Sequence, residues 1–92
     1  MTKYLLIEEA SGDNVYPVDT TVTVFDDCDD AVRTADLYYN TLNAMERRER
    51  VVYVVAVTEK DLCPHAVTVD GSTDWTRYKS CTSIRMARLY NE

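Results

Sequence analysis

The sequence predicts a small α+β domain, in which a mainly antiparallel sheet of four to five strands carries one long amphipathic helix on one face. Two observations lead to this fold class. Residues 28–45 place apolar side chains at helical spacing, and Val51 to Thr58 form the almost unbroken apolar run typical of a central strand. A chain of 92 residues has room for a single domain, 1–92, with one small core. A helix laid over a sheet buries the apolar surfaces of both.

Two strands are predicted before the helix. Tyr4 to Glu8 begins with apolar, β-favouring residues, and Thr20 to Phe25 alternates threonine with valine, which indicates one buried face. Residues 10–14 between them read Ala-Ser-Gly-Asp-Asn, a composition typical of turns. We therefore expect the two strands to pair as a hairpin with a long loop.

The helix is predicted to run from about Cys28 to Met45. Asp26 or Asp27 can cap its N-terminus, and carboxylates in its first turn meet the positive end of the helix dipole. Arginines within residues 46–50 suit the negative end. The apolar stripe is expected to consist of Cys28, Val32, Ala35, Tyr39 and Leu42, widened by Ala31, Tyr38 and Met45.

The pattern is weaker after Thr58. A helical turn is expected over residues 61–64, where the proline stops it. Two short strands, 66–69 and 75–80, flank the hairpin-type turn Asp70-Gly71. Residues 83–89 fit an edge strand or a short terminal helix, and we favour the strand.

Charge is divided unevenly along the chain. Residues 1–45 carry a net charge of −7 and residues 46–92 a net charge of +1, which together make the overall −6. This balance disfavours direct binding of nucleic acid and of anionic membranes, because both need a basic surface. No apolar run approaches the ~18 residues of a membrane-spanning helix. A signal peptide is not expected either, because the apolar run near the N-terminus is short and two glutamates follow it. The three cysteines lack a disulfide-framework spacing, so we expect reduced thiols in a cytoplasmic protein.

The acidic run at the start of the helix is the first candidate site. As a calcium loop it fails, because Ala31 and Leu37 stand where glycine and glutamate are required. It also lacks a neighbouring His or Lys to separate the pKa values of a carboxylate pair. Two interpretations remain open, a solvated helix start and an acidic patch that docks on a basic protein. The candidate partner-binding residues are Asp26, Asp27, Asp29, Asp30, Asp36, Leu37 and Tyr38, the last two as an exposed apolar shoulder beside the acids.

Other chemistry has less support. Cys63 and His65 stand two residues apart and could meet on an extended chain, but no third orienting group can be identified. A zinc site would need Cys28, Cys63, His65 and Cys81, which lack the paired cysteine spacing. Trp75 and Tyr78 could stack on bases, although covering the end of a small core is the favoured interpretation. No phosphate-binding loop or nucleophile elbow occurs, so we expect no catalytic residues, no metal and no cofactor.

The chain is short and acidic, has no catalytic motif and shows a strand–helix–strand pattern in residues 3–58. In these features it resembles the small inhibitor proteins encoded by phages and mobile elements, of which anti-CRISPR proteins are the best-known group. The resemblance implies a protein that blocks a nucleic-acid-binding partner by presenting acids where phosphates would sit. It carries no diagnostic motif, so it transfers no functional residue. The sequence departs from a full nucleic-acid mimic, because −6 is a modest charge and bases fill the second half.

Three functional hypotheses follow. The first is a non-enzymatic inhibitor or modulator that binds a basic, nucleic-acid-handling protein through the acidic residues, Leu37 and Tyr38. The second is a structural module that self-associates as a homodimer through a sheet edge. The third is a small-molecule or nucleotide sponge with an aromatic pocket around Trp75 and Tyr78.

Overall fold

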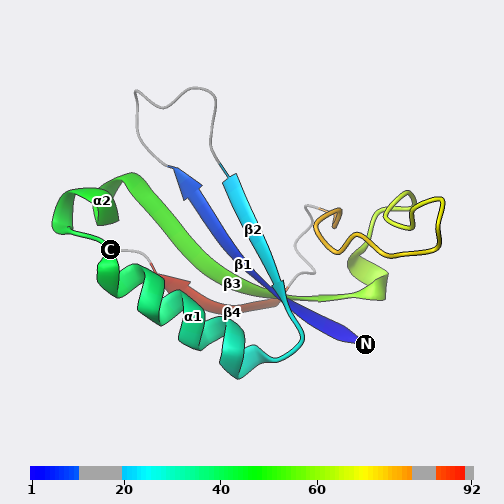
Figure 1. Cartoon of the computed structure of the whole chain (residues 1–92), viewed down its shortest axis with the longest axis horizontal. Coiled ribbons are helices and arrows are strands. Elements are labelled where there is room, and N and C mark those ends of the chain that lie inside the picture. The colour runs from blue at the N-terminus through cyan, green and yellow to red at the C-terminus, as the bar shows by residue number, and fades with distance from the viewer. Residues whose placement is uncertain (11–19, 80–84, 91–92) are drawn as a thin grey trace.

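A computed structural model of the chain describes residues 1–10, 20–79 and 85–90. Its four strands are β1 (Thr2–Ala10), β2 (Thr20–Phe25), β3 (Arg50–Thr58) and β4 (Arg85–Tyr90), and they form one antiparallel sheet in the order β2-β1-β3-β4 (Figure 1). Helix α1 (Cys28–Thr41) packs on this sheet. The predicted α+β fold class is confirmed, with four strands. Within the described ranges, no helix combines the length and apolar character that crossing a membrane requires.

The first two strands form the predicted hairpin. Their register runs without interruption from Tyr4 opposite Phe25 to Glu9 opposite Thr20. β3 pairs with the other side of β1 along nine residue pairs, so β1 and β3 together form the centre of the sheet, as the apolar run of β3 predicted. Leu5, Leu6 and Ile7 are consecutive and all buried, which means that both faces of the sheet are covered at this point.

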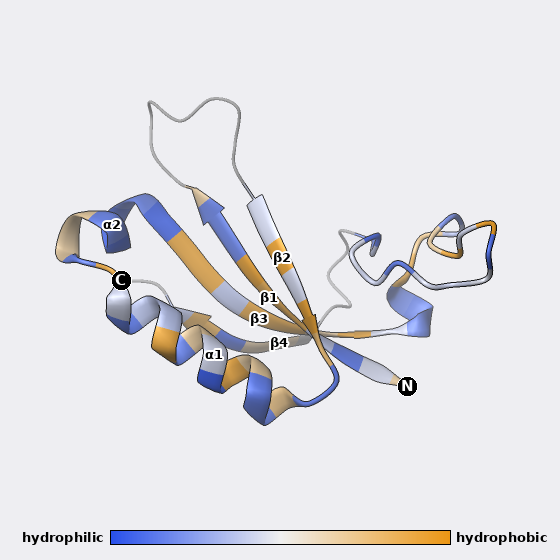
Figure 2. Cartoon of the chain, viewed as in Figure 1, coloured by the Kyte–Doolittle hydropathy of each residue, from blue (hydrophilic) through white to orange (hydrophobic). Residues whose placement is uncertain are grey.

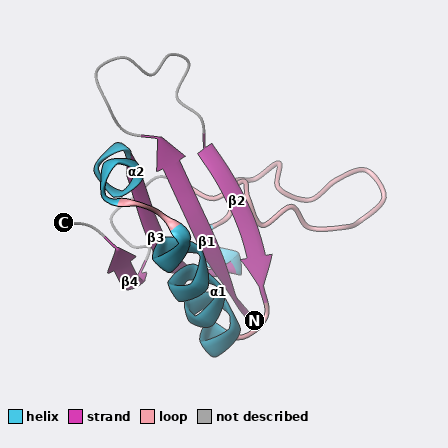
Figure 3. Ribbon diagram, turned by 60° about the vertical axis from the view of Figure 1, so that its left-hand side comes forward, coloured by secondary structure: helices cyan, strands magenta, loops and turns pink. Residues whose placement is uncertain are grey.

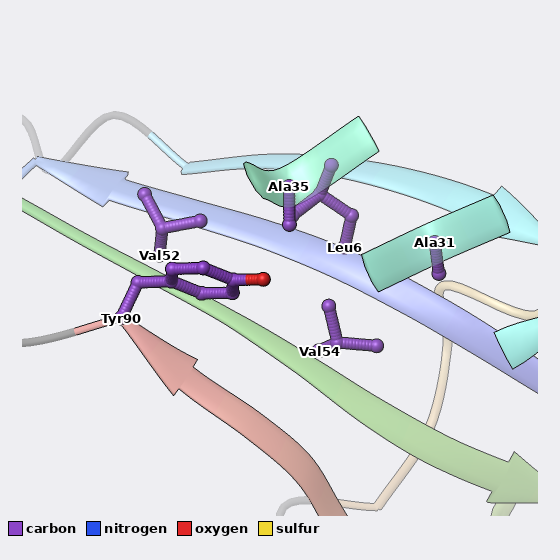
Figure 4. Close-up of a cluster of buried hydrophobic side chains, with 6 residues drawn as sticks. All are labelled: Leu6, Ala31, Ala35, Val52, Val54 and Tyr90. Atoms are coloured by element: carbon purple, nitrogen blue, oxygen red, sulfur yellow. The ribbon is translucent and has the colours of Figure 1, made fainter. Parts of the chain in front are cut away.

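Helix α1 lies over one face of the sheet and contacts all four strands (Figure 3). It approaches closely because the two residues it buries completely, Ala31 and Ala35, are small. Beneath them lie Leu6 of β1 and Val54 of β3, and the ring of Tyr90 closes the far side of this cluster (Figure 4). The sequence pattern therefore identified the buried stripe of the helix between Cys28 and Leu42 correctly.

The predicted end of the helix at Met45 is wrong. α1 ends at Thr41, Leu42 is extended, and a separate short helix, α2 (Ala44–Glu49), begins after Asn43. Asn43 and Glu46 form a capping box, in which each side chain accepts a hydrogen bond from the other residue's backbone N–H, at 2.9 Å and 3.1 Å. This capping box gives hydrogen-bond partners to N–H groups at the start of α2. It therefore favours a new helix that begins after Asn43 over a continuation of α1. Met45 is consequently 68% exposed and does not widen the stripe.

The opposite face of the sheet is covered by the segment that follows β3. After a single 3-10 turn, η1 (Glu59–Asp61), the residues Leu62, Trp75 and Tyr78 pack against a second buried cluster. That cluster consists of Leu5, Ile7, Val55 and Val57. Figure 2 shows this segment leaving the end of β3, with apolar residues at its outermost loop. The preferred interpretation of Trp75 and Tyr78 as core-covering residues is confirmed.

The two short strands predicted in this segment do not form. Only isolated bridges remain, between Leu62 and Tyr78 and between Val67 and Thr73, and Ser80 lies outside the described residues. The expected turn does form at Gly71, whose φ of +88° is favoured by glycine. Asp70 and Asp74 explain the missing strands, because their carboxylates accept hydrogen bonds from nearby backbone and hydroxyl groups and stabilise turns in place of a ladder. The predicted helical turn at 61–64 is displaced to Glu59–Asp61.

The final element is a strand, as favoured. β4 pairs with β3 from Ala56 opposite Arg85 to Val52 opposite Tyr90, with an irregularity at Ala87 between two register blocks. Residues 83 and 84 of the predicted strand lie outside the described residues.

Candidate functional site

The acidic run forms an exposed corner of the molecule where β2 passes into α1. We call Asp26, Asp27, Asp29 and Asp30 the acidic corner. All four residues are exposed, and Asp27 occupies the N-cap position, as predicted. The Asp27 side chain makes no capping hydrogen bond, so helix capping does not account for this carboxylate. Asp29 and Asp30 lie in the first turn, where the helix dipole favours negative charge.

Two of these acids are engaged by bases of the same chain. Asp26 forms an ion pair with Lys3, whose ammonium group also lies 5.9 Å from the centre of the Trp75 ring. Asp30 lies 3.4 Å from the guanidinium of Arg33, one turn further along the helix. Within the described residues Asp27 and Asp29 have no ion-pair partner. Among the residues that the structure describes, the corner thus keeps a negative charge that no base pairs with.

Asp36 does not belong to this corner. It accepts a hydrogen bond from the Tyr90 hydroxyl, and the Arg88 guanidinium lies 3.7 Å from the same carboxylate oxygen. Burial, followed by the bond to Asp36, raises the pKa of Tyr90 to about 12. Asp36 therefore joins α1 to β4, and the structure does not bring it together with the acidic corner.

The expected apolar shoulder is reduced to one residue. Leu37 is 65% exposed and points outward from α1. Tyr38 is half-buried against the helix-side core and hydrogen-bonds to Arg50, and burial raises its pKa above the ordinary value. The structure thus places the Tyr38 ring against the core and does not make it part of a fully exposed shoulder with Leu37.

Leu37 and the acidic corner share one surface. Asp30, Arg33, Thr34, Leu37 and Thr41 recur at helical spacing along the outer side of α1, and all are exposed. Asp30 and Leu37 are seven residues apart, so ~10 Å separates them along the helix axis. We call this side, from Asp26 to Thr41, the outer face of α1. It combines an unneutralised acidic end with one large exposed apolar side chain.

Basic residues gather beyond the other end of the outer face. Arg47 and Arg48 stand in α2, and Arg50 begins β3. The Arg47 guanidinium lies 4.6 Å from the centre of the Tyr39 ring, which holds it against the body of the protein. Glu46 and Glu49 of α2 stand among these arginines, so the charges at this end of α1 are mixed, in contrast to the acidic corner.

The other candidates do not converge on a reactive site. Cys63 is half-buried, its backbone N–H donates to the Arg77 carbonyl at 2.9 Å, and His65 is exposed. Cys81 lies outside the described residues. In the described part of the chain, no three His, Cys, Asp or Glu side chains stand close enough together to hold a metal ion.

A pocket of about 310 Å³ lies between the start of α1 and the sheet. Its lining combines polar and apolar surface and consists of Tyr4, Cys28, Ala56, Met86 and Ala87. The polar groups among these side chains are one phenol and one thiol, which provide no charged group to orient a ligand. Trp75 and Tyr78 contact the second buried cluster of the sheet with their rings. The pocket thus lacks the charged group that would orient the phosphate of a nucleotide, and the two rings serve as cover for the core.

The outer face of α1 therefore remains the surface with the most distinctive chemistry. No protein-family model matches this chain, and no curated protein or solved structure is similar enough to be matched with it.

Proposed function

We propose that this chain is a protein-binding inhibitor or modulator that docks the outer face of α1 on a basic, nucleic-acid-handling partner. The observation that carries the proposal is the exposure of Leu37, in line with an acidic corner that the described residues leave partly unneutralised. Protein interfaces commonly surround an apolar centre with a polar rim. Leu37 would supply contact area, and the acidic corner would steer the approach.

The charge distribution supports a basic partner. Unneutralised carboxylates at one end of α1 attract a basic surface, whereas acids and bases are mixed beyond its other end, so the attraction is concentrated at the acidic corner. A surface that handles nucleic acid is basic because it meets phosphates. Carboxylates of the acidic corner would occupy positions that phosphates otherwise take, which is the mode of action implied by the resemblance to small phage inhibitors.

The test is capture of a partner from host-cell lysate, followed by measurement of affinity with the purified partner. Leu37→Gln should weaken binding by about tenfold to a hundredfold, since burying a leucine contributes ~1.5–3 kcal/mol. The double replacement Asp27→Asn with Asp29→Asn should weaken it as well and should flatten its dependence on salt. Duplex DNA should compete with the chain for the partner.

Matched controls separate these effects from general changes of the surface. Leu89→Gln alters a leucine that is also half exposed but lies on β4, and Glu49→Gln removes a charge at the end of α2. Both controls should bind as the original chain does. A captured protein that binds all variants equally, or that DNA does not displace, would contradict the proposal.

A further inference from the structure

Strand β2 forms an unprotected edge of the sheet. All six of its residues pair with β1 in continuous register, and no described segment pairs with its other side. Such an edge presents a row of unpaired N–H and C=O groups to any strand that can align with it. In Figure 1, β2 borders the sheet on the side away from β4.

The two edges of the sheet are built differently. β4 contains Arg85 and Arg88 and has an irregular register at Ala87, and charged residues and bulges are features that discourage edge pairing. β2 has neither, because its sequence Thr-Thr-Val-Thr-Val-Phe contains no charge and no proline and its register is regular. It is also the one described strand without a charged residue.

A second copy of this chain suits this edge. When β2 pairs with itself in antiparallel fashion about a two-fold axis at Thr23, Val22 stands opposite the second copy's Val24, and Thr23 stands opposite its equivalent. Pairs of β-branched residues and pairs of threonines are favourable across strands. The pairing would cover Val24, which is 40% exposed in the single chain. A two-fold contact of this kind closes on itself and ends at a dimer.

The charge of the chain does not oppose this arrangement. Two copies with a net charge of −6 repel each other, but the contacting strands themselves are uncharged. In the antiparallel register described above, the two Asp26 residues lie six positions apart along the strands, which is ~20 Å. This separation exceeds the screening length of about 8 Å at physiological ionic strength. The two acidic corners therefore point to opposite ends of the pair.

We propose that the chain forms a homodimer in which the β2 edges of two copies pair in antiparallel fashion and join the two sheets into one. In this register five β2 residues a side, Thr21 to Phe25, pair with one another, so the contact is small, and interfaces below about 1,200 Å² are typical of weak complexes. The dimer is accordingly in equilibrium with monomer at micromolar concentrations. Leu37 on α1 takes no part in the strand pairing, so this inference does not rest on the proposed partner.

Sedimentation velocity from low micromolar to millimolar concentration tests the dimer. The original chain should shift from monomer to dimer, and Thr23→Lys should raise the Kd at least tenfold by placing two like charges opposite each other. Thr34→Lys is the matched control, because it adds the same charge at an exposed threonine on α1 and should leave the Kd within a fewfold. Circular dichroism checks that both variants are folded.

Amide hydrogen exchange of the original chain provides a test that needs no variant. Protection of the β2 amides should rise with protein concentration, while that of the β4 amides should not. A chain that stays monomeric at millimolar concentration overturns the proposal. A dimer that Thr23→Lys leaves intact also overturns it. So does a dimer that Leu37→Gln dissociates, because Leu37 lies on α1 and not on β2.

Discussion

The hydrogen bond from Tyr90 to Asp36 joins the last strand to the middle of α1, and removing it measures how firmly that helix is held. A hydrogen bond to a charged group contributes about 1.5–3 kcal/mol. Asp36 is 41% exposed, so water competes for its carboxylate and the lower end of that range, about 1.5 kcal/mol, applies. Arg88, 3.7 Å away and also exposed, adds at most about 1 kcal/mol to the stability that Asp36 contributes.

The assay is a double-mutant cycle of Tyr90→Phe and Asp36→Asn, with urea unfolding followed by circular dichroism. Each single variant should lower the free energy of unfolding, and their effects should couple by about 1–1.5 kcal/mol because both remove the same bond. A domain of this length has a stability of roughly 5–14 kcal/mol, so the loss is measurable. Asp29→Asn serves as a control for the loss of one carboxylate from α1, because Asp29 has no ion-pair partner among the described residues and its replacement should cost only the ~0.3–1 kcal/mol of its interaction with the helix dipole. Additive effects, with a coupling below about 0.5 kcal/mol, would refute the reasoning.

The same bond predicts a change in alkaline stability. The pKa of Tyr90 is raised by burial and by Asp36 from 10 to about 12 in the folded protein. Below pH 10 the phenol is protonated in both the folded and the unfolded state, and its contribution to stability is complete. Between pH 10 and about 12 the unfolded state loses this proton first, so the free energy of unfolding falls as the pH rises. In Asp36→Asn, ultraviolet titration should find a lower pKa for Tyr90.

Three further predictions concern the packing and the turns. Ala35→Leu should destabilise the protein by about 1–3 kcal/mol in urea unfolding, because the Cβ of Ala35 is fully buried against the sheet. Thr34→Leu, on the exposed side of α1, should cost less than about 0.5 kcal/mol. Equal losses would show that α1 does not lie close to the sheet. Asn43→Ala should cost about 1 kcal/mol by removing the capping box of α2, and an unchanged midpoint of unfolding would argue for one continuous helix. The hydrogen bonds that Asp70 accepts, first from Thr68 and then from Ser72, lower the pKa of its carboxyl to about 2. A carboxyl titration by NMR should find the midpoint of Asp70 at that pH, and a higher midpoint in Ser72→Ala. An ordinary midpoint in the original chain would contradict the turn geometry.

The core of the fold was predictable because local patterns specify it. Helical spacing identified the buried alanines of α1, and the unbroken apolar run identified β3 as a central strand. The end of α1 was missed because Leu42 and Met45 both fit the apolar period, while the decisive interaction was a capping box between Asn43 and Glu46. A periodic pattern of apolar residues over a long window does not reveal a single capping interaction at which one helix ends and another begins.

The candidate site was only partly predictable. Exposure of Leu37 follows from its position relative to the buried alanines, and the charge of the acidic corner follows from composition. The role of Asp36 could not be inferred, because its partner Tyr90 is 54 residues away in the sequence. The contact of Tyr38 with Arg50 could not be inferred for a similar reason, since it depends on where β3 begins beside the helix.

The position of β1 in the middle of the sheet has a consequence for how the chain folds. β1 is the first strand to be synthesised, yet its pairing with β3 joins residues from 40 positions apart, Ala10 with Arg50, to 56 positions apart, Thr2 with Thr58. Closing these long loops costs entropy before the contacts form, which slows folding of such topologies relative to helical bundles. The hairpin of β1 and β2 can form early, but it gains a hydrophobic cover on both faces only after the segment beyond β3 exists. Substitutions in the β1–β3 pair should therefore slow folding, whereas substitutions around Trp75 should mainly speed unfolding.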